Sequence, residues 1–155
     1  MISSVEAWFK GRGWTPFPFQ REVWRRYLAG ESGLVHVPTG FGKTLAAWLG
    51  PVMEGAGAPG AAEVPSKRGD APPLAVLWIT PMRALAQDLV KNLREVTGEV
   101  APGWLVEGRT GDTNSTERGR QSRRLPTALV TTPESLSVLL SREDAAERFR
   151  SEERR

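Results

Sequence analysis

The amino-acid sequence predicts an α/β fold in which a parallel β-sheet is flanked by helices. The apolar runs LAVLWIT (residues 74–80) and TALVTT (127–132) are nearly continuous, as in strands that are buried on both faces of a parallel sheet. Segments with helical apolar spacing follow both runs, so strands and helices alternate along the chain. A glycine-rich turn, GFGKT (40–44), stands between another short apolar run and a helical segment.

Two helices are expected before this turn. Ser3 or Ser4 can cap the first, and the sequence GRGW (11–14) ends it. The second begins near Pro18, a residue that suits the first turn of a helix, and ends at Gly30. Both helices have an apolar face, formed by Val5, Trp8 and Phe9 in the first and by Val23, Trp24, Tyr27 and Leu28 in the second.

After these helices, strands and helices are expected in turn. Residues 33–37 (GLVHV) predict a short strand, and residues 45–53 predict the helix that follows the glycine-rich turn. A helix with Leu85, Leu89 and Leu93 at spacings of four is expected after the 74–80 strand. The last two candidates are a strand at 104–108 (WLVEG) and a short helix at 133–141 (PESLSVLLS). This order places the connecting loops at the carboxyl ends of the strands, where α/β proteins bind ligands.

Two segments interrupt this pattern. Thirteen of the 19 residues from 55 to 73 are glycine, alanine or proline, which predicts a flexible surface insertion rather than a domain boundary. Residues 142–155 hold five arginines and five acidic residues, and only Phe149 is large and apolar. We therefore expect one domain over residues 1–141, followed by a charged tail.

Composition limits the classes of function. The 155 residues include no cysteine, which excludes disulfides, thiolate metal sites and cysteine nucleophiles, and the only histidine is His36. No apolar run approaches the roughly 20 residues that a membrane span needs. The N-terminus has no cleavable signal pattern, so a cytoplasmic location without a membrane partner is expected. The net charge of +3 and the pI of about 9.8 favour a polyanionic partner.

The glycine-rich turn predicts a phosphate-binding loop. Glycines permit the close approach and the unusual dihedrals that converging backbone N–H groups require, and the following helix N-terminus adds positive potential. Lys43 supplies a charge for the β- and γ-phosphates, and Thr44 supplies a hydroxyl for Mg²⁺. The strict motif has glycine six positions before the lysine, where this chain has Val37. The core of the motif is intact: Pro38, Thr39, Gly40, Phe41, Gly42, Lys43 and Thr44.

A candidate for base recognition lies upstream of this loop. A glutamine amide can form two hydrogen bonds with adenine, at N6 and N7, and an aromatic ring can stack on the base. Gln20 is the candidate adenine reader in GWTPFPFQREVW (13–24), with Trp14 or Phe17 as the stacking surface. A glutamine near a helix start is more often a solvated residue, and the phosphate loop downstream favours the functional interpretation.

Two Thr-Pro loops and an arginine-rich stretch suggest a track for nucleic acid. TPMRAL (80–85) and TPESL (132–136) each follow a predicted strand, and helix-start N–H groups can hold backbone phosphates together with Arg83. Between them, residues 109–124 hold five arginines against one aspartate and one glutamate. An arginine-rich helix face is usually only solvated, but the turn RTGDT (109–113) is placed to touch a phosphate.

In this order and spacing, PTGFGKT, TPMRAL, RTGDT and TPESL resemble the first motor domain of superfamily 2 DExH/D-box helicases. The strings LVHVPTGFGKTLAAWLGP, LWITPMRALAQDL and ALVTTPESLSVLLS are most similar to the Lhr-like group, in particular the bacterial ligase-associated DExH helicases. The resemblance covers residues 14–149. It implies a RecA-like P-loop NTPase fold, ATP and Mg²⁺ as cofactors, and 3′-to-5′ movement along single-stranded DNA. It also implies a role in DNA repair, beside repair ligase or nuclease proteins.

The resemblance also assigns residues. Gln20 would read adenine, and Pro38, Thr39, Gly40, Phe41, Gly42, Lys43 and Thr44 would hold the triphosphate. Lys43 and Thr44 would be the catalytic residues, with Thr44 at the metal. The DNA track would be lined by Pro81, Arg83, Thr110, Gly111, Thr132 and Pro133.

The acidic D-E-x-H or D-E-x-D box of such enzymes is not found in this sequence. In the family, its aspartate helps to hold Mg²⁺ and its glutamate orients the attacking water. None of the aspartates ends an apolar run: they are Asp70, Asp88, Asp112 and Asp144. We therefore expect an incomplete first motor domain, a truncated or frameshifted N-terminal fragment without the second motor domain. Such a fragment would bind nucleotide weakly and hydrolyse it negligibly.

Three alternatives remain open at this point. A small-molecule kinase would transfer phosphate to a small acceptor without DNA. A non-enzymatic nucleic-acid-binding module would bind DNA with strong salt dependence, unaffected by ATP or by Lys43→Ala. A chain without function would be poorly soluble and degraded in cells.

Overall fold

The computed structural model describes residues 2–56 and 63–149, and a three-stranded parallel sheet lies at its centre. The strands are β1 (Val76–Ile79), β2 (Val106–Arg109) and β3 (Ala128–Thr131), in the spatial order β1-β3-β2. The register pairs Val76 of β1 and Val106 of β2 with Ala128. Every residue of β3 is buried, as expected for a central strand with helices on both faces. The predicted α/β fold with a parallel sheet is confirmed.

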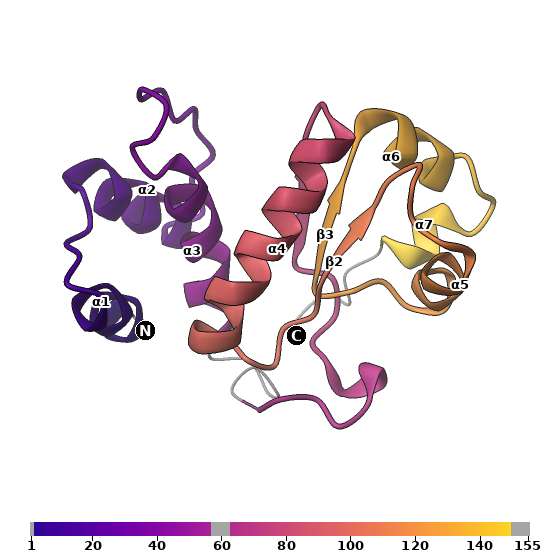
Figure 1. The fold of residues 1–155 in the computed structure, drawn as a ribbon, viewed down its shortest axis with the longest axis horizontal. Helices are drawn as coiled ribbons and strands as arrows, with labels where there is room; N and C mark the ends of the chain where they lie inside the picture. The colour runs from indigo at the N-terminus through magenta and orange to yellow at the C-terminus, as the bar shows by residue number, and fades with distance from the viewer. Residues whose placement is uncertain (1, 57–62, 150–155) are drawn as a thin grey trace.

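The helices on one side of the sheet are α1 (Ile2–Gly11), α2 (Pro18–Leu28), α3 (Lys43–Gly55) and α4 (Arg83–Val100) (Figure 1). Helix α4 packs directly on β2 and β3, and α3 packs on the other three helices. Trp48 lies fully buried between them, with its ring centroid 6.2 Å from that of Trp78 and 6.0 Å from that of Trp104. Trp8 and Trp24, which lie on the predicted apolar faces of the first two helices, are buried in the same core.

The opposite side of the sheet carries the shorter helices α5 (Ser115–Arg123), α6 (Pro133–Leu140) and α7 (Ala145–Arg148) (Figure 1). A smaller apolar cluster lies there, formed by Leu125, Leu129 and Leu139 with Leu74 and Phe149 packed against it. The short helix expected after the last strand is thus present as α6. Among the residues that the structure describes, no helix is both long enough and apolar enough to cross a membrane.

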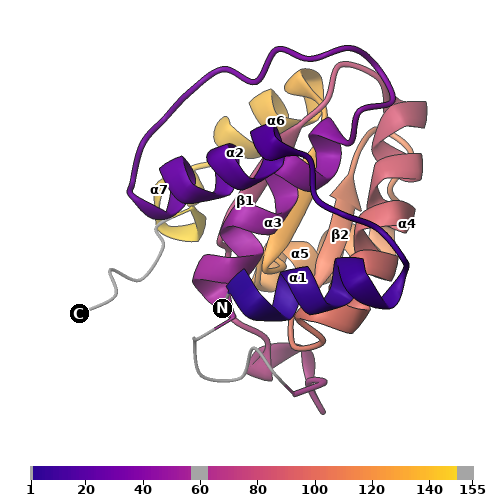
Figure 2. The ribbon, with the colours of Figure 1, turned by 90° about the vertical axis from the view of Figure 1, so that its left-hand side faces the viewer.

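The strand predicted at residues 33–37 is not formed. The chain between α2 and α3 instead runs as a long loop over these two helices, and Leu34 is 92% exposed (Figure 2). A short apolar segment becomes a strand only when a neighbour offers its backbone groups for pairing. In the described part of the chain, β3 pairs with β1 and β2, and residues 33–37 do not pair with the outer edge of either strand. This part of the prediction was wrong.

The glycine-, alanine- and proline-rich segment at 55–73 is described only in part. Gly55 is the last residue of α3, and the 3₁₀ turn η1 (Arg68–Asp70) lies near the other end of the segment. Residues 57–62, like residues 150–155 of the charged tail, lie outside the described residues. The flexibility of the insertion and the boundary at residue 141 stay predictions.

Candidate nucleotide and nucleic-acid sites

The glycine-rich loop leads directly into the N-terminus of α3. Gly40 and Gly42 have φ angles of 87° and 78°, in the left-handed region that residues with a Cβ rarely adopt. Gly42 is the N-cap of α3, and no side chain caps this helix end. The first N–H groups of α3 therefore remain available to a negatively charged ligand, and the helix dipole adds to that preference.

Lys43 and Thr44 are the first two residues of α3. The Lys43 ammonium group donates to the carbonyl oxygens of Val37 and Pro38, at 2.6 and 2.9 Å. These bonds hold the cation inside the loop that precedes the helix, and they use two of its three donors. Thr44 is exposed beside it. A cation, a hydroxyl and a helix N-terminus are thus gathered within one turn of chain.

Gln20 is joined to this loop. Its side chain is almost fully buried, its Oε1 accepts from the N–H of Phe17 at 2.8 Å, and its Nε2 donates to the carbonyl of Gly42 at 3.1 Å. A Cβ on Gly42 would lie 2.7 Å from that Nε2, so the close approach depends on glycine. The amide therefore connects the start of α2 to the loop before α3.

Aromatic rings lie next to this amide. Phe17 and Phe41 have ring centroids 5.8 Å apart, and each residue is nearly half exposed. A pocket of about 280 Å³ adjoins Phe17, lined by Phe9, Trp14, Thr15, Phe17, Gln20, Gly40, Gly42 and Leu45. Trp14 packs edge-on against Trp8. An amide, exposed rings and the phosphate loop therefore border one pocket, as the sequence analysis expected of a nucleotide site.

The surroundings of Thr44 fit a metal ion that arrives with a nucleotide. In the described ranges, no three acidic or histidine side chains come together in a way that could hold a metal. Mg²⁺ is commonly bound through one or two protein ligands, with water and substrate phosphates completing the octahedron. The exposed hydroxyl of Thr44, beside the uncapped helix end, suits that role.

The two Thr-Pro loops form helix starts at the carboxyl edge of the sheet. Pro81 is exposed after β1, and Arg83 begins α4. Pro133 begins α6 after β3, and the buried Thr132 caps that helix, because its hydroxyl oxygen accepts from the N–H of Ser135 at 3.4 Å. The Thr132 side chain is therefore occupied with the helix cap, while the helix ends beside both prolines face outward.

The turn after β2 meets the first of these loops. Asp112 lies 3.3 Å from the guanidinium of Arg83, and both side chains are more than half exposed. A Cβ on Gly111 would lie 2.6 Å from Cζ of Arg83, so the two loops approach closely at this glycine. The pKa of Glu134, at the start of α6, is lowered by its own backbone N–H, by the Thr132 hydroxyl and by the charge of Arg83. Arg83 therefore lies close to the loops that follow β2 and β3.

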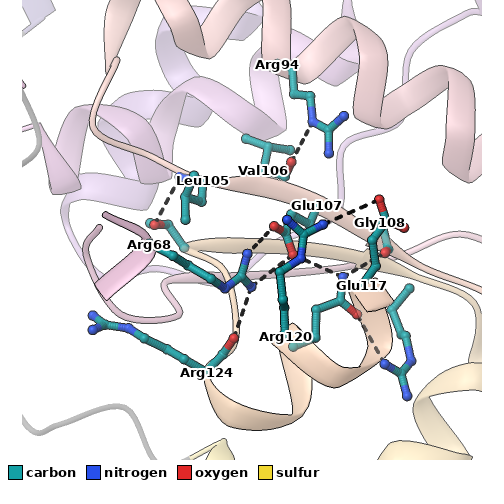
Figure 3. A network of polar contacts seen from close by, with 12 residues as sticks. Arg68, Arg94, Leu105, Val106, Glu107, Gly108, Glu117, Arg120 and Arg124 are labelled. Carbon is teal, nitrogen blue, oxygen red and sulfur yellow. Dashed lines mark hydrogen bonds and ion pairs between the residues drawn. The ribbon is translucent and has the colours of Figure 1, made fainter. Parts of the chain in front are cut away.

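The structure also contains a polar network that was not predicted from the sequence, and it joins η1, β2 and α5 (Figure 3). Arg68 of η1 forms an ion pair with Glu107 of β2 and also donates to the carbonyl of Arg124 at 3.0 Å. Gln121 of α5 donates to the same carboxylate at 3.1 Å. Burial raises the pKa of Glu107, but the hydrogen bonds from Arg68 and Gln121 outweigh it, and the pKa is lowered overall. The partners are 14 to 56 residues apart in sequence, and no local pattern connects them.

Comparison with known proteins identifies relatives among the helicases. The sequence profile of the DEAD/DEAH box helicase family matches residues 17–152. The ATP-dependent helicase Lhr-Core protein 2 of Thermococcus barophilus is 34% identical over 162 aligned positions, covering 97% of this chain and 18% of that protein. The Lhr helicase/probable uracil glycosylase of Mycolicibacterium smegmatis is 36% identical over 147 positions, covering 88% of this chain and 9% of that protein. The chain thus spans less than a fifth of the length of these relatives.

Solved structures of helicases are similar in fold to this chain. The Mycobacterium smegmatis helicase Lhr, bound to single-stranded DNA and AMP-PNP, has a TM-score of 0.67 at 34% identity, covering 86% of this chain and 17% of that one. A hypothetical ATP-dependent RNA helicase from Sulfolobus tokodaii has a TM-score of 0.67 at 20% identity, covering 91% and 37%, and supports the fold alone. The Lhr-like resemblance and the RecA-like fold are confirmed, and the ligase-associated subgroup stays a prediction. The chain belongs to the DEAD/DEAH box helicase family.

Proposed function

We propose that this chain forms the ATP-binding and DNA-binding part of a motor domain in an Lhr-like DNA helicase that acts in DNA repair. The bond between Gln20 and Gly42 carries the proposal, because it joins the candidate adenine reader to the candidate phosphate loop. The relative bound to single-stranded DNA and AMP-PNP supports the same pair of ligands.

In this proposal the base lies in the pocket beside Gln20, against the ring of Phe17 or of Trp14, which both line it. The N–H groups at the start of α3 bind the phosphates, and Lys43 exchanges its two carbonyl partners for phosphate oxygens. Thr44 ligates Mg²⁺, which supplies positive charge against the triphosphate oxygens when it is bound.

The nucleic acid follows the carboxyl edge of the sheet. Its sugar-phosphate backbone meets the helix start beside Pro81, then Arg83 with the turn of Thr110 and Gly111, and then the helix start at Thr132 and Pro133. Backbone N–H groups and arginine are the usual partners of phosphate oxygens, and they fix position without reading sequence.

Hydrolysis by this chain alone is expected to be negligible. No Asp-Glu pair occurs in the 155 residues, so the carboxylates that orient water and help to hold the metal in this class are not supplied by this sequence. Charge that develops on the transferred phosphoryl group would then lack most of its stabilisation. DNA-stimulated ATP turnover by the purified chain, abolished by Lys43→Ala, would contradict this part of the proposal.

Nucleotide binding is tested by titrating the chain with a fluorescent ATP analogue and competing with ATP or GTP. We expect ATP to compete better than GTP, Lys43→Ala to abolish binding, and Gln20→Ala to remove the preference for ATP. Lys10→Ala, which removes an exposed lysine from α1, is the matched control and is expected to bind as the wild type does. Equal binding by wild type and Lys43→Ala would refute the assignment of the loop.

DNA binding is tested with labelled single-stranded oligonucleotides of deoxythymidine and uridine, each with and without ATP. We expect DNA to bind, with an affinity that changes when ATP is added. Salt-dependent binding that neither ATP nor Lys43→Ala alters would instead support the non-enzymatic binding module, and stronger binding of the RNA would refute the DNA assignment.

A further inference from the structure

Arg118 of α5 is bound to the backbone of the turn that precedes its helix. Its Nε donates to the carbonyl of Thr113 at 2.7 Å, and its Nη2 donates to the carbonyls of Gly111 at 2.6 Å and Thr110 at 3.4 Å. The residue is partly buried, and no ion pair of Arg118 is found among the described residues. Its donors therefore serve the carbonyl side of the turn rather than a carboxylate.

These bonds act together with the turn's own hydrogen bonds to set the direction of its N–H groups. In a trans peptide unit the C=O and the following N–H point in opposite directions, and the described chain contains no cis peptide. The carbonyl of Thr110 accepts from the N–H of Thr113 at 3.2 Å and from Arg118 at 3.4 Å, so the N–H of Gly111 points away from both donors. The next N–H, that of Asp112, is taken by the hydroxyl of Thr110 at 3.3 Å. The N–H of Gly111 has no hydrogen-bond partner within residues 2–56 and 63–149.

The free N–H lies beside a cation. A Cβ on Gly111 would be within 2.6 to 2.9 Å of three guanidinium atoms of Arg83, and only glycine leaves room for this approach. An N–H donor and a guanidinium that lie side by side are a suitable pair for one phosphate group, because both donate hydrogen bonds to its oxygens.

We propose that Arg118 is a positioning residue for the nucleic-acid track: by holding the carbonyls of the Thr110–Thr113 turn, it directs the Gly111 N–H, next to Arg83, at one backbone phosphate. The inference rests on the proposed function, because it assumes that this edge binds nucleic acid. Arg118 itself does not contact the phosphate. Arg120 on the same helix differs in its surroundings: it is exposed, and its nearest carboxylate, that of Glu117, is 3.9 Å away.

The test measures binding of fluorescein-labelled single-stranded DNA to the whole chain by anisotropy, at several salt concentrations. We expect Arg118→Ala to weaken binding about tenfold at every salt concentration, a difference of about 1.4 kcal/mol. The slope of log affinity against log salt should stay unchanged, because no phosphate-neutralising charge is lost. Arg83→Ala should lower that slope by about 0.7, the value for one phosphate contact on a single strand. Arg120→Ala removes an exposed charge from the same helix; it is expected to change the affinity less than Arg118→Ala does and, unlike Arg118→Ala, to lower the slope.

A second measurement follows the Gly111 amide in a ¹H–¹⁵N NMR spectrum during titration with unlabelled DNA. The signal should shift in the wild type and in Arg120→Ala, but not in Arg118→Ala. Thermal unfolding shows whether each variant is folded, and if Arg118→Ala is not, Arg118→Lys keeps the charge while reaching fewer carbonyls and gives the same readout.

The outcomes separate the two proposals. A wild type that binds no DNA refutes the proposed function, and this inference with it. A wild type that binds while Arg118→Ala binds equally well overturns only the role of Arg118. A slope that falls with the affinity of Arg118→Ala overturns the positioning role as well, because Arg118 then contacts a phosphate directly.

Discussion

Replacing Arg68 with methionine is expected to destabilise the chain through Glu107. The substitution keeps an apolar stem of similar length but removes the ion pair with Glu107 and the hydrogen bond to the carbonyl of Arg124. The two charged side chains are only 23% and 17% exposed, so water replaces the lost partner poorly. A hydrogen bond to a charged group contributes about 1.5–3 kcal/mol, and breaking a fully buried ion pair costs about 3–5 kcal/mol. For this partly buried pair we expect a loss of about 2–3 kcal/mol at pH 7.

The loss of stability in Arg68→Met should depend on pH, because the ion pair that it removes requires an ionised Glu107 carboxylate. In the wild type the pKa of Glu107 lies below its usual value of 4.5, so the stabilisation is complete above that value and disappears as the pH falls through the lower folded pKa. In Arg68→Met, burial is the largest remaining influence and should raise the pKa of Glu107 above its usual value. The gap in stability between wild type and variant should therefore be widest near neutral pH. It should begin to narrow above pH 4.5, as Glu107 of the variant becomes protonated, and should narrow further below pH 4.5, as the wild type loses its stabilisation.

Urea unfolding followed by tryptophan fluorescence measures this gap at pH 7 and near pH 4. Arg25→Met is the matched control: it breaks an ion pair with Glu22 in which both side chains are well exposed, and it should leave the midpoint at pH 7 almost unchanged. A loss of stability in Arg68→Met that is equal at both pH values would refute the reasoning, because the effect would then come from packing and not from the unpaired carboxylate.

Three further substitutions test packing and backbone geometry. Gly55→Ala adds a methyl group that overlaps the buried ring of Trp104, and should lower the free energy of unfolding in urea by about 1–3 kcal/mol. Gly42→Ala forces a side chain into φ 78° next to the Gln20 amide; it should cost about 1–2 kcal/mol and reduce the increase in melting temperature that ATP produces. Asn114→Ala removes the side-chain cap of α5 and should cost about 1 kcal/mol, so an unchanged urea midpoint would contradict the capping role.

Local chemistry explains which parts of the fold could be predicted from sequence. Strand β3 is recognisable because every residue is buried between helices, which requires an unbroken apolar run. The start of α3 is recognisable because the turn before it needs glycine at two positive φ angles. The helical period of α4 was predicted, and of its three leucines Leu93 lies in the core and Leu89 packs against it. Leu85 is 49% exposed, while Ala86 is fully buried beneath the helix, because a small residue lets α4 approach the sheet.

The parts of the fold that could not be predicted depend on contacts between segments that lie far apart in the sequence. Residues 33–37 have strand-forming residues, yet no partner strand in the described chain gives them a ladder. In the sequence, Glu107 is one polar residue in a weakly predicted strand. Its role as a hydrogen-bond acceptor is visible only in the fold, where η1 and α5 bring Arg68 and Gln121 to its carboxylate. For the candidate sites, the motif spacing predicted that Gln20 and the glycine-rich loop would lie together, whereas the contacts of Arg118 required the folded turn.

The arginine-rich stretch at residues 109–124 shows why composition alone overstates the contact with phosphate. Arg109 is 5% exposed and donates to Gln121. Arg118 donates to the turn before α5, and Arg124 donates to the carbonyls of Gly69 and Ala71 at 2.5 and 2.7 Å. These three guanidinium groups stabilise the protein backbone or its core, and binding a phosphate would require them to give up bonds that they already make.

The charge that remains at the surface sets the salt dependence of nucleic-acid binding. Arg120 and Arg123 of this stretch are exposed, and so is Arg83, which forms an exposed ion pair with Asp112. Each phosphate contact on a single strand contributes about 0.7 to the slope of log affinity against log salt, so these three arginines support a slope of about two. All five arginines of the stretch together with Arg83 would give a slope of about four. A measured slope near four would mean that the bonds of Arg109, Arg118 and Arg124 open when DNA binds, and the turn described above would then not keep its conformation in the complex.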